Sequence, residues 1–292
     1  MSAAAPDSYR SPAVVLARDL KFPEGPLVDL DGDIWCVELR GGALCRISPA
    51  GKVYRYLVGG APNGLALDDT GNIWYCDAER SEIRCFEPGS SRVHGVLGSI
   101  DGQDLAAPND LAFDNAGHLL FTCPGNSRKE PTGYVGCLAR SGKALVVAHD
   151  LLFPNGIAFA PDGHTLYLAE TYRLRVSGAR WVSSCPHELA LSPLCETPGP
   201  IGPDGLAVDS LGRVHACIYG AGMLLVASAS GAIEDRIFVP GGHPTNCAFD
   251  PLQRFGLIVT EADTGSVLCF PNLGPGVRPF TGRATGHARV QP

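Results

Sequence analysis

The chain has 292 residues, of which 45% are hydrophobic and 18% are charged, and its formal net charge is −7. This length fits one large domain or two small ones, with enough apolar residues for a substantial core. The acidic balance argues against a surface that binds nucleic acid or an anionic membrane, because both need a basic face. Residues 1–12 contain no apolar stretch of signal-peptide length, and we expect them to form a loose tail.

The first strand is expected at residues 13–20 (AVVLARDL), directly before a motif that recurs along the chain. Its copies read FPEGPLVD, APNGLALD, APNDLAFD, FPNGIAFA, GPDGLAVD and HPTNCAFD. The residue after the proline of each copy stands at position 24, 63, 109, 155, 204 or 245. A repeat of about 40–50 residues that holds several short strands is typical of a β-propeller.

Each repeat has the same internal order, which is clearest in the second copy. The strand LALD (65–68) is followed by a polar turn and by the strands IWYCDA (73–78), SEIRCFEP (81–88) and RVHGVLG (92–98). This pattern predicts an all-β, single-domain chain with six blades of four antiparallel strands at residues 13–272. The last repeat lacks a fourth strand, so we expect residues 13–20 to complete it and to remove the open edge. Residues 275–292 are predicted to form a second loose tail.

The six residues that follow the motif prolines are predicted to face one mouth of the central channel. All carry oxygen donors, and in chain order they are Glu24, Asn63, Asn109, Asn155, Asp204 and Thr245. Two carboxylates balance a divalent charge and amide oxygens add neutral ligands, which is the chemistry that a hard cation prefers. The alternative is structural, since Asn and Asp are also common turn residues after proline.

The motifs FPEGPLVDLDGDIWCVE, APNDLAFDNAGHLLFT, FPNGIAFAPDGHTLYLAETYRLRV and GPDGLAVDSLGRVHACIYGAGMLLV together resemble the gluconolactonase/regucalcin (senescence marker protein) family. The resemblance implies a six-bladed propeller with a divalent metal in its channel and, in many members, hydrolysis of sugar lactones. It assigns Glu24, Asn155 and Asp204 as metal ligands, with Asp204 also as the general base. Asn109 matches an Asn that contacts metal or substrate.

Two positions depart from the family pattern, and both bear on which lactone is the substrate. Cys123 stands where bacterial lactonases often have an Asp, and Ala107 stands where animal members have an Arg that contacts substrate. We also consider Asn63, Asn109 and Cys123 as substrate contacts. The polar loop 124–133 is either a plain surface loop or a lid in which Asn126, Ser127 or Arg128 touches substrate.

The sequence therefore predicts a metal-dependent lactonase that binds one divalent ion and a small-molecule lactone. We expect Ca²⁺ first, with Mg²⁺, Mn²⁺, Zn²⁺ and Fe²⁺ as alternatives. A phosphotriesterase-like hydrolase and a non-catalytic calcium-binding propeller remain alternative functions. Eleven cysteines without a CxxC pair, and no run of about 18 apolar residues, favour a reduced cytoplasmic protein without a membrane span. The oligomeric state is not predicted.

Overall fold

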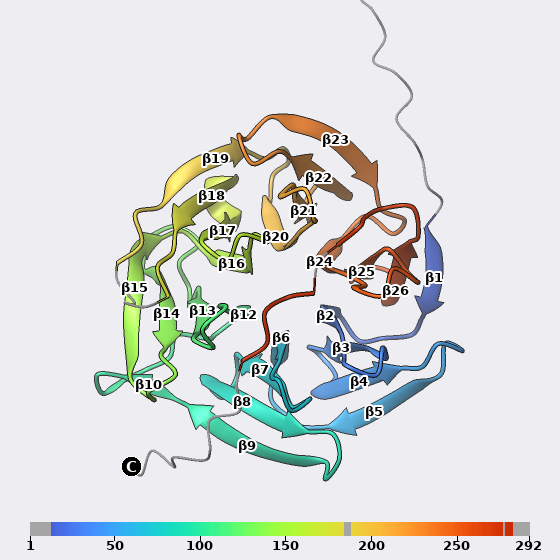
Figure 1. Ribbon diagram of the computed structural model, residues 1–292, viewed down its shortest axis with the longest axis horizontal. Helices are drawn as coiled ribbons and strands as arrows, with labels where there is room; N and C mark the ends of the chain where they lie inside the picture. The colour runs from blue at the N-terminus through green and yellow to red at the C-terminus, as the bar shows by residue number, and fades with distance from the viewer. Residues whose placement is uncertain (1–12, 184–187, 277, 283–292) are drawn as a thin grey trace, which may run out of the picture.

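The fold is that of a computed structural model, and residues 13–183, 188–276 and 278–282 are described. It contains six four-stranded antiparallel sheets arranged as blades around a central axis (Figure 1). The predicted six-bladed propeller is therefore confirmed. The predicted tail at residues 1–12, and residues 283–292 of the second tail, lie outside the described residues. Within the described part of the chain, no helix is long and apolar enough to span a membrane.

The strands follow one another from the channel outwards in each blade. Blade 1 comprises β2 (Pro23–Val28), β3 (Ile34–Glu38), β4 (Ala43–Ile47) and β5 (Val53–Leu57). Blade 2 comprises β6 (Pro62–Leu67), β7 (Ile73–Asp77), β8 (Glu82–Glu87) and β9 (Arg92–Leu97). Blade 3 comprises β12 (Leu111–Phe113), β13 (Leu119–Cys123), β14 (Gly133–Leu138) and β15 (Ala144–Leu151).

The second half of the chain repeats this order. Blade 4 comprises β16 (Pro154–Phe159), β17 (Thr165–Glu170), β18 (Arg175–Arg180) and β19 (Ser192–Glu196). Blade 5 comprises β20 (Pro203–Val208), β21 (Val214–Ile218), β22 (Met223–Ala227) and β23 (Ile233–Phe238). Blade 6 comprises β24 (Pro244–Phe249), β25 (Leu257–Glu261) and β26 (Ser266–Phe270), and its fourth strand is β1 (Val14–Ala17). A short hairpin, β10 (Ser99–Ile100) and β11 (Gln103–Asp104), and the 3₁₀ turn η1 (Thr171–Arg173) complete the elements.

The two ends of the propeller meet in blade 6. Val14 of β1 pairs with Cys269 of β26, and the two strands are antiparallel. The N-terminal strand thus completes the last blade, as the sequence predicted, and pairs an edge that would otherwise be open to other chains.

The hydrophobic core is divided into six clusters, and each of them joins two neighbouring blades. In the cluster between blades 1 and 2, for example, Trp35 packs with Phe86 at a ring-centroid distance of 5.8 Å. Apolar residues on both faces of each sheet therefore contribute to the core, which explains why the strands read as short apolar runs rather than as alternating patterns. This packing fixes the inner strands, and with them the residues that line the channel.

In five of the six blades an Asp follows the inner strand and holds the turn to the next strand. In the second blade, Asp68 Oδ1 accepts hydrogen bonds from the backbone nitrogens of Thr70 and Asn72 at 2.9 Å each. The other carboxylate oxygen, Oδ2, accepts a hydrogen bond from Trp74 Nε1 at 3.0 Å. Asp68 is thus used to hold a turn and a core tryptophan, and it is not available for chemistry.

Candidate functional site

The motif proline begins the inner strand in five of the six blades, and a β-bulge follows it in each of these five. In blade 1, Glu24 pairs with Val37, and the register then shifts before Leu27 pairs with Trp35. A bulge re-aims the side chain at that point of a strand. The residues after the prolines therefore share one end of the channel, which we call the motif end. Glu24 and Asn155 are buried there, and Asp204 is half-buried.

Three carboxylates interact electrostatically at the motif end. Burial, and then the negative charge of Asp204, raises the pKa of Glu24 well above its usual value. Burial raises the pKa of Asp204 to about 8. The Asn155 side chain opposes this rise, and the negative charge of Asp110 adds to it. Burial also raises the pKa of Asp110 to about 6. Carboxylates that are hard to ionise because they are buried together gain most from a bound cation.

The amide of Asn155 is oriented by the neighbouring strands. Asn155 Nδ2 donates a hydrogen bond to Thr171 Oγ1 at 3.2 Å, and Thr171 Oγ1 in turn donates to the carbonyl oxygen of Pro203 at 2.7 Å. Asn155 also donates a hydrogen bond to Asp204. Because the amide nitrogen is used in this way, the carbonyl oxygen is the group that Asn155 can offer to a cation.

Two residues of this cluster, Asp110 and Asn246, were missed by the sequence analysis. They occupy the position after the predicted ring residue, where the other four motif copies have glycine. Asn246 Oδ1 accepts a hydrogen bond from Cys247 N at 2.8 Å. Asn246 also lowers the pKa values of the Glu24 and Asp110 carboxyl groups, which lie on blades 1 and 3, against the larger effect of burial.

Glycines of adjacent blades make room for these two side chains. A Cβ on Gly64 would overlap Asp110 Oδ1, and a Cβ on Gly205 would overlap the side-chain amide of Asn246. The replacement of Gly by Asp in the third copy and by Asn in the sixth copy is therefore the sequence signal that could have identified both residues.

The donor set fits a hard divalent cation. Glu24 and Asp204 supply two carboxylates and Asn155 supplies a neutral oxygen, as the sequence analysis predicted for a metal such as Ca²⁺. Glu24 Oε2 accepts a hydrogen bond from Gly25 N at 3.0 Å, which fixes the carboxylate next to its own backbone. The site thus combines carboxyl groups that would gain from a positive counter-charge with side chains that the protein already holds in position.

The remaining predicted ring residues differ in what they can offer. Asn63 is buried at the start of β6, and Asn109 is half-buried just before β12. Thr245 is buried, and its hydroxyl donates to the carbonyl oxygen of Pro23 at 2.7 Å. Thr245 therefore ties blade 6 to blade 1, whereas Asn63 and Asn109 stay candidates for contact with metal or substrate.

Cys123 does not lie at the solvent-exposed mouth of the channel. Its side chain is fully buried in the cluster between blades 2 and 3. Burial raises the pKa of its thiol to about 12, and the thiol hydrogen-bonds with Tyr134. A protonated, buried thiol of this kind is a core group rather than a nucleophile.

The loop 124–133 is anchored beside the motif of blade 4. Ser127 is buried; its hydroxyl donates to the carbonyl oxygen of Pro124 at 2.6 Å and accepts from Phe153 N at 2.9 Å. Asn126 and Arg128 are exposed on this loop. The Arg128 guanidinium lies 5.6 Å from the ring centroid of Phe153 and thus close to the motif end.

Aromatic side chains stand on opposite sides of the motif end. Phe22, directly before the motif proline of blade 1, has a ring-centroid distance of 6.5 Å to Tyr219. Phe153, three blades away, lies 5.4 Å from Tyr172. Both phenylalanines have left-handed backbone conformations, with φ of 60° for Phe22 and 55° for Phe153. Such conformations are rare for bulky residues and concentrate at functional sites.

A second cluster of potential ligands lies on blade 6. His243, Glu261 and Asp263 each offer a ligand atom, and these atoms lie within 4.8 Å of one another. Glu261 already accepts hydrogen bonds from the backbone nitrogens of His243 and Asp263, at 2.9 and 3.0 Å. Its second oxygen accepts from the backbone and hydroxyl of Thr264. Glu261 therefore holds a loop, and we do not assign a metal to this cluster.

Comparisons with known proteins identify a family and several proteins of similar structure. The model of the family described as the SMP-30/Gluconolactonase/LRE-like region matches residues 22–263. A gluconolactonase of Zymomonas mobilis is 25% identical over 131 residues, which is 39% of this chain and only 36% of that protein. A gluconolactonase structure from Xanthomonas campestris has a TM-score of 0.78 at 25% identity, with 89% of each chain covered. The calcium-binding protein regucalcin from Agrobacterium tumefaciens has a TM-score of 0.77 at 20% identity, with 91% of this chain and 96% of that chain covered.

Proposed function

The chain belongs to the SMP-30/gluconolactonase/LRE-like family, and we propose that it is a divalent-metal-dependent hydrolase that opens a lactone ring. The observation that carries this proposal is the cluster of Glu24, Asn155 and Asp204 at the motif end of the channel. These residues come from three blades, and the pKa values of both carboxylates are raised by burial. Titratable groups that are perturbed in this way mark candidate active sites.

The proposed cofactor is one divalent cation, with Ca²⁺ as the first candidate, held by Glu24, Asn155 and Asp204 with Asn109 as a further candidate ligand. When bound, it would supply the positive charge that polarises the lactone carbonyl and stabilises the oxyanion. Support for the choice of a hard cation is the oxygen-only donor set.

The protein's own residues would orient the reactants and move the proton. Asp204 is the half-buried carboxylate of the cluster, so it is the one that water and substrate can reach. We assign it as the base that accepts a proton from the attacking water. Glu24 is held by Gly25 and Asn246, and Asn155 is held by Thr171. These contacts keep two ligand side chains fixed while Asp204 acts.

The aromatic side chains around the site favour a lactone substrate that carries an apolar or aromatic group. Phe22 with Tyr219, and Phe153 with Tyr172, place aromatic rings on two sides of the motif end. Tyr219 lies close enough to Asp204 that the carboxylate raises the pKa of the phenol, after the larger effect of burial. Arg40 lies over the ring of Phe22, and Arg128 lies beside the rings of Phe153 and Tyr172. The rings can stack on a flat apolar group, and the guanidinium groups can bind a polar substituent of the same substrate.

The proposal is tested by hydrolysis assays on chelated protein and on protein to which Ca²⁺ has been restored. The substrates are D-glucono-1,5-lactone, dihydrocoumarin and γ-butyrolactone, with diisopropyl fluorophosphate as the phosphotriester. Calcium-dependent ring opening of any of these lactones supports the proposal. Turnover of the phosphotriester alone would favour a phosphotriesterase. Calcium binding without turnover of any substrate would favour a non-catalytic calcium-binding propeller.

A further inference from the structure

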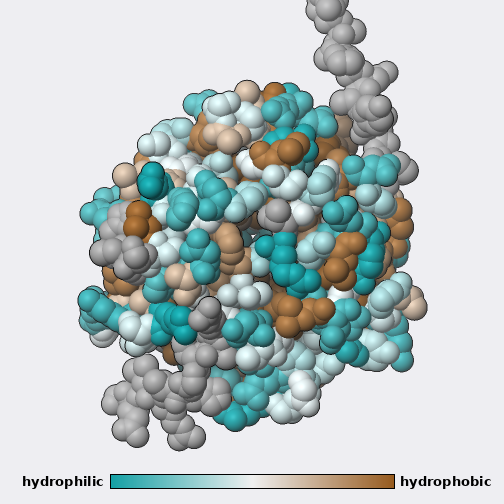
Figure 2. All heavy atoms as spheres, viewed as in Figure 1, coloured by the Kyte–Doolittle hydropathy of each residue, from teal (hydrophilic) through white to brown (hydrophobic). Residues whose placement is uncertain are grey.

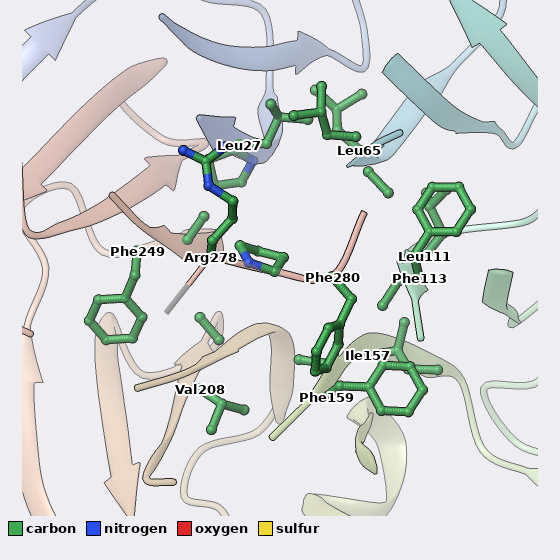
Figure 3. Close-up of a pocket in the computed structure, with 18 of the residues that line it drawn as sticks. Leu27, Leu65, Leu111, Phe113, Ile157, Phe159, Val208, Phe249, Arg278 and Phe280 are labelled. Atoms are coloured by element: carbon green, nitrogen blue, oxygen red, sulfur yellow. The ribbon is translucent and has the colours of Figure 1, made fainter. Parts of the chain in front are cut away.

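The half of the channel away from the motif end contains a cavity of about 210 Å³ (Figure 3). All six inner strands line it, each with three successive apolar side chains. In blade 3, for example, they are Leu111, Ala112 and Phe113.

The cavity exists because small residues occupy the middle position of the lining. Five of the six strands have alanine there, namely at Ala66, Ala112, Ala158, Ala207 and Ala248. Larger apolar side chains at these positions would fill the space. Protein interiors contain few voids larger than a water molecule, because such voids are destabilising. A void of this size, enclosed by apolar side chains, is suited to hold a ligand.

Asp110 and Asn246 separate this cavity from the candidate metal site. Both line the cavity, and they come from the inner strands or strand entries of blades that face each other across the channel. Glu24, Asn155 and Asp204 are not among the residues that line it. The cavity is therefore a compartment of its own below the metal site.

A segment from the C-terminal part of the chain closes the opposite side. Residues 278–281 line the cavity, and Phe280 lies edge-on to Phe159 at a centroid distance of 6.2 Å. The segment is held by Gly282, whose carbonyl oxygen accepts from Asp69 N at 2.6 Å, and by Pro275, whose carbonyl oxygen accepts from Ser210 N at 3.0 Å. It thus runs from blade 5 to blade 2 over the mouth of the channel.

We propose that this cavity is a binding site for a small, uncharged, apolar molecule, independent of the metal site. An apolar cavity of about 150 Å³ accommodates benzene, so the present one is sized for about six to ten non-hydrogen atoms. Neutral ligands are favoured because the side chains that line the cavity are apolar apart from Asp110 and Asn246 at one end and Arg278 and Thr281 at the other. A single polar group on the ligand can hydrogen-bond to the channel-facing edges of the inner strands.

The test is a calorimetric titration of toluene into the full-length protein, with calcium and with EDTA. Saturable one-to-one binding is expected in both conditions. The double variant Ala112→Leu/Ala158→Leu fills the cavity and should bind at least tenfold more weakly, whereas Ala50→Leu in an exposed turn should bind like the wild type. The proposal is overturned if the wild type shows no saturable binding, if binding requires calcium, or if the filled variant binds equally well.

A second measurement does not depend on a variant that folds. Crystals of the wild-type protein under xenon pressure should show a xenon site among Ala112, Ala158 and Phe249. Xenon at other places only would contradict the proposal.

Discussion

Asn246 and Asp110 lie on blades that face each other across the propeller, and the Asn246 side chain favours the ionised form of Asp110 and so lowers its pKa against the larger effect of burial. Asn246 has the same effect on the pKa of Glu24. One side chain therefore connects the candidate metal ligand of blade 1 to the buried carboxylate of blade 3, and it separates the polar end of the channel from the apolar end.

Removal of the Asn246 amide is predicted to weaken metal binding. In Asn246→Ala, Glu24 loses a donor that favours its ionised form, so the affinity for Ca²⁺ should fall by about 10- to 100-fold. Isothermal titration calorimetry measures this directly. Asn272→Ala changes an exposed Asn and serves as the control. Equal Ca²⁺ affinity in Asn246→Ala and the control would show that the contact does not support the site.

Gly205 is predicted to act on the site through Asn246. A Cβ at position 205 would overlap the Asn246 side-chain amide, so Gly205→Ala should displace that side chain. We expect the variant to bind Ca²⁺ more weakly and its free energy of unfolding to fall by about 1–3 kcal/mol. Gly89→Ala is the matched control, because no atom lies within 4 Å of its added Cβ. Urea unfolding and calorimetry measure the two effects. A Gly205→Ala protein with unchanged stability and affinity would refute this role.

The metal-free protein is predicted to lose stability as the pH rises. The folded-state pKa values of Asp110 (about 6) and Asp204 (about 8) lie above the usual Asp value of 3.8, mainly through burial. The folded state therefore holds protons that the unfolded chain releases. The stabilisation from these two groups is fully present below about pH 4 and is lost as the pH rises to about 8. For each proton that the folded state retains, the folding equilibrium constant falls by about tenfold per pH unit.

Thermal unfolding in EDTA between pH 5 and pH 9 tests this dependence. Asp204→Asn should remove the part of the decline between about pH 6 and pH 8, and added Ca²⁺ should suppress the decline in the wild type. A chelated wild type whose melting temperature rises or stays constant over this range would contradict the predicted sign.

The aromatic wall of blade 4 is predicted to affect substrate choice. Loss of one aromatic contact in Tyr172→Ala should raise KM for dihydrocoumarin by up to about tenfold and leave KM for γ-butyrolactone nearly unchanged. Tyr54→Ala is a suitable control. Tyr54 lies beside cationic side chains, as Tyr172 lies beside Arg128, but it belongs to the outer strand of blade 1. Equal changes in KM for both lactones would argue against a stacking role.

The repeat made most of the fold predictable, because its period and its strand order are visible in the residues. The closure of blade 6 by residues near Val14 was also predictable, since one strand was missing at one end of the chain and surplus at the other. The segment around Phe280 was different. Residues 275–282 were expected in a tail, and the structure places the described ones across the channel, where Phe280 packs on Phe159. That contact depends on tertiary packing between segments about 120 residues apart, for which the local sequence has no periodic signal.

The candidate site was predictable only in part for a related reason. The oxygen-donor ring follows from the position after each proline, which led to Glu24, Asn155 and Asp204. Asp110 and Asn246 come one residue later, and a glycine of a neighbouring blade accommodates each of them. Their part in the cluster depends on contacts between blades, so a pattern read within each repeat could not find it.

The central claim is tested most directly by lactone hydrolysis in the wild type and in Asp204→Asn, each assayed after EDTA treatment and again with Ca²⁺ restored. Circular dichroism checks that both proteins are folded. We expect the wild type to be inactive after chelation and active with Ca²⁺. We expect Asp204→Asn to stay folded and to remain slower by about 10²- to 10⁴-fold. Wild-type rates in Asp204→Asn, or full activity of the chelated wild type, would contradict the assignment.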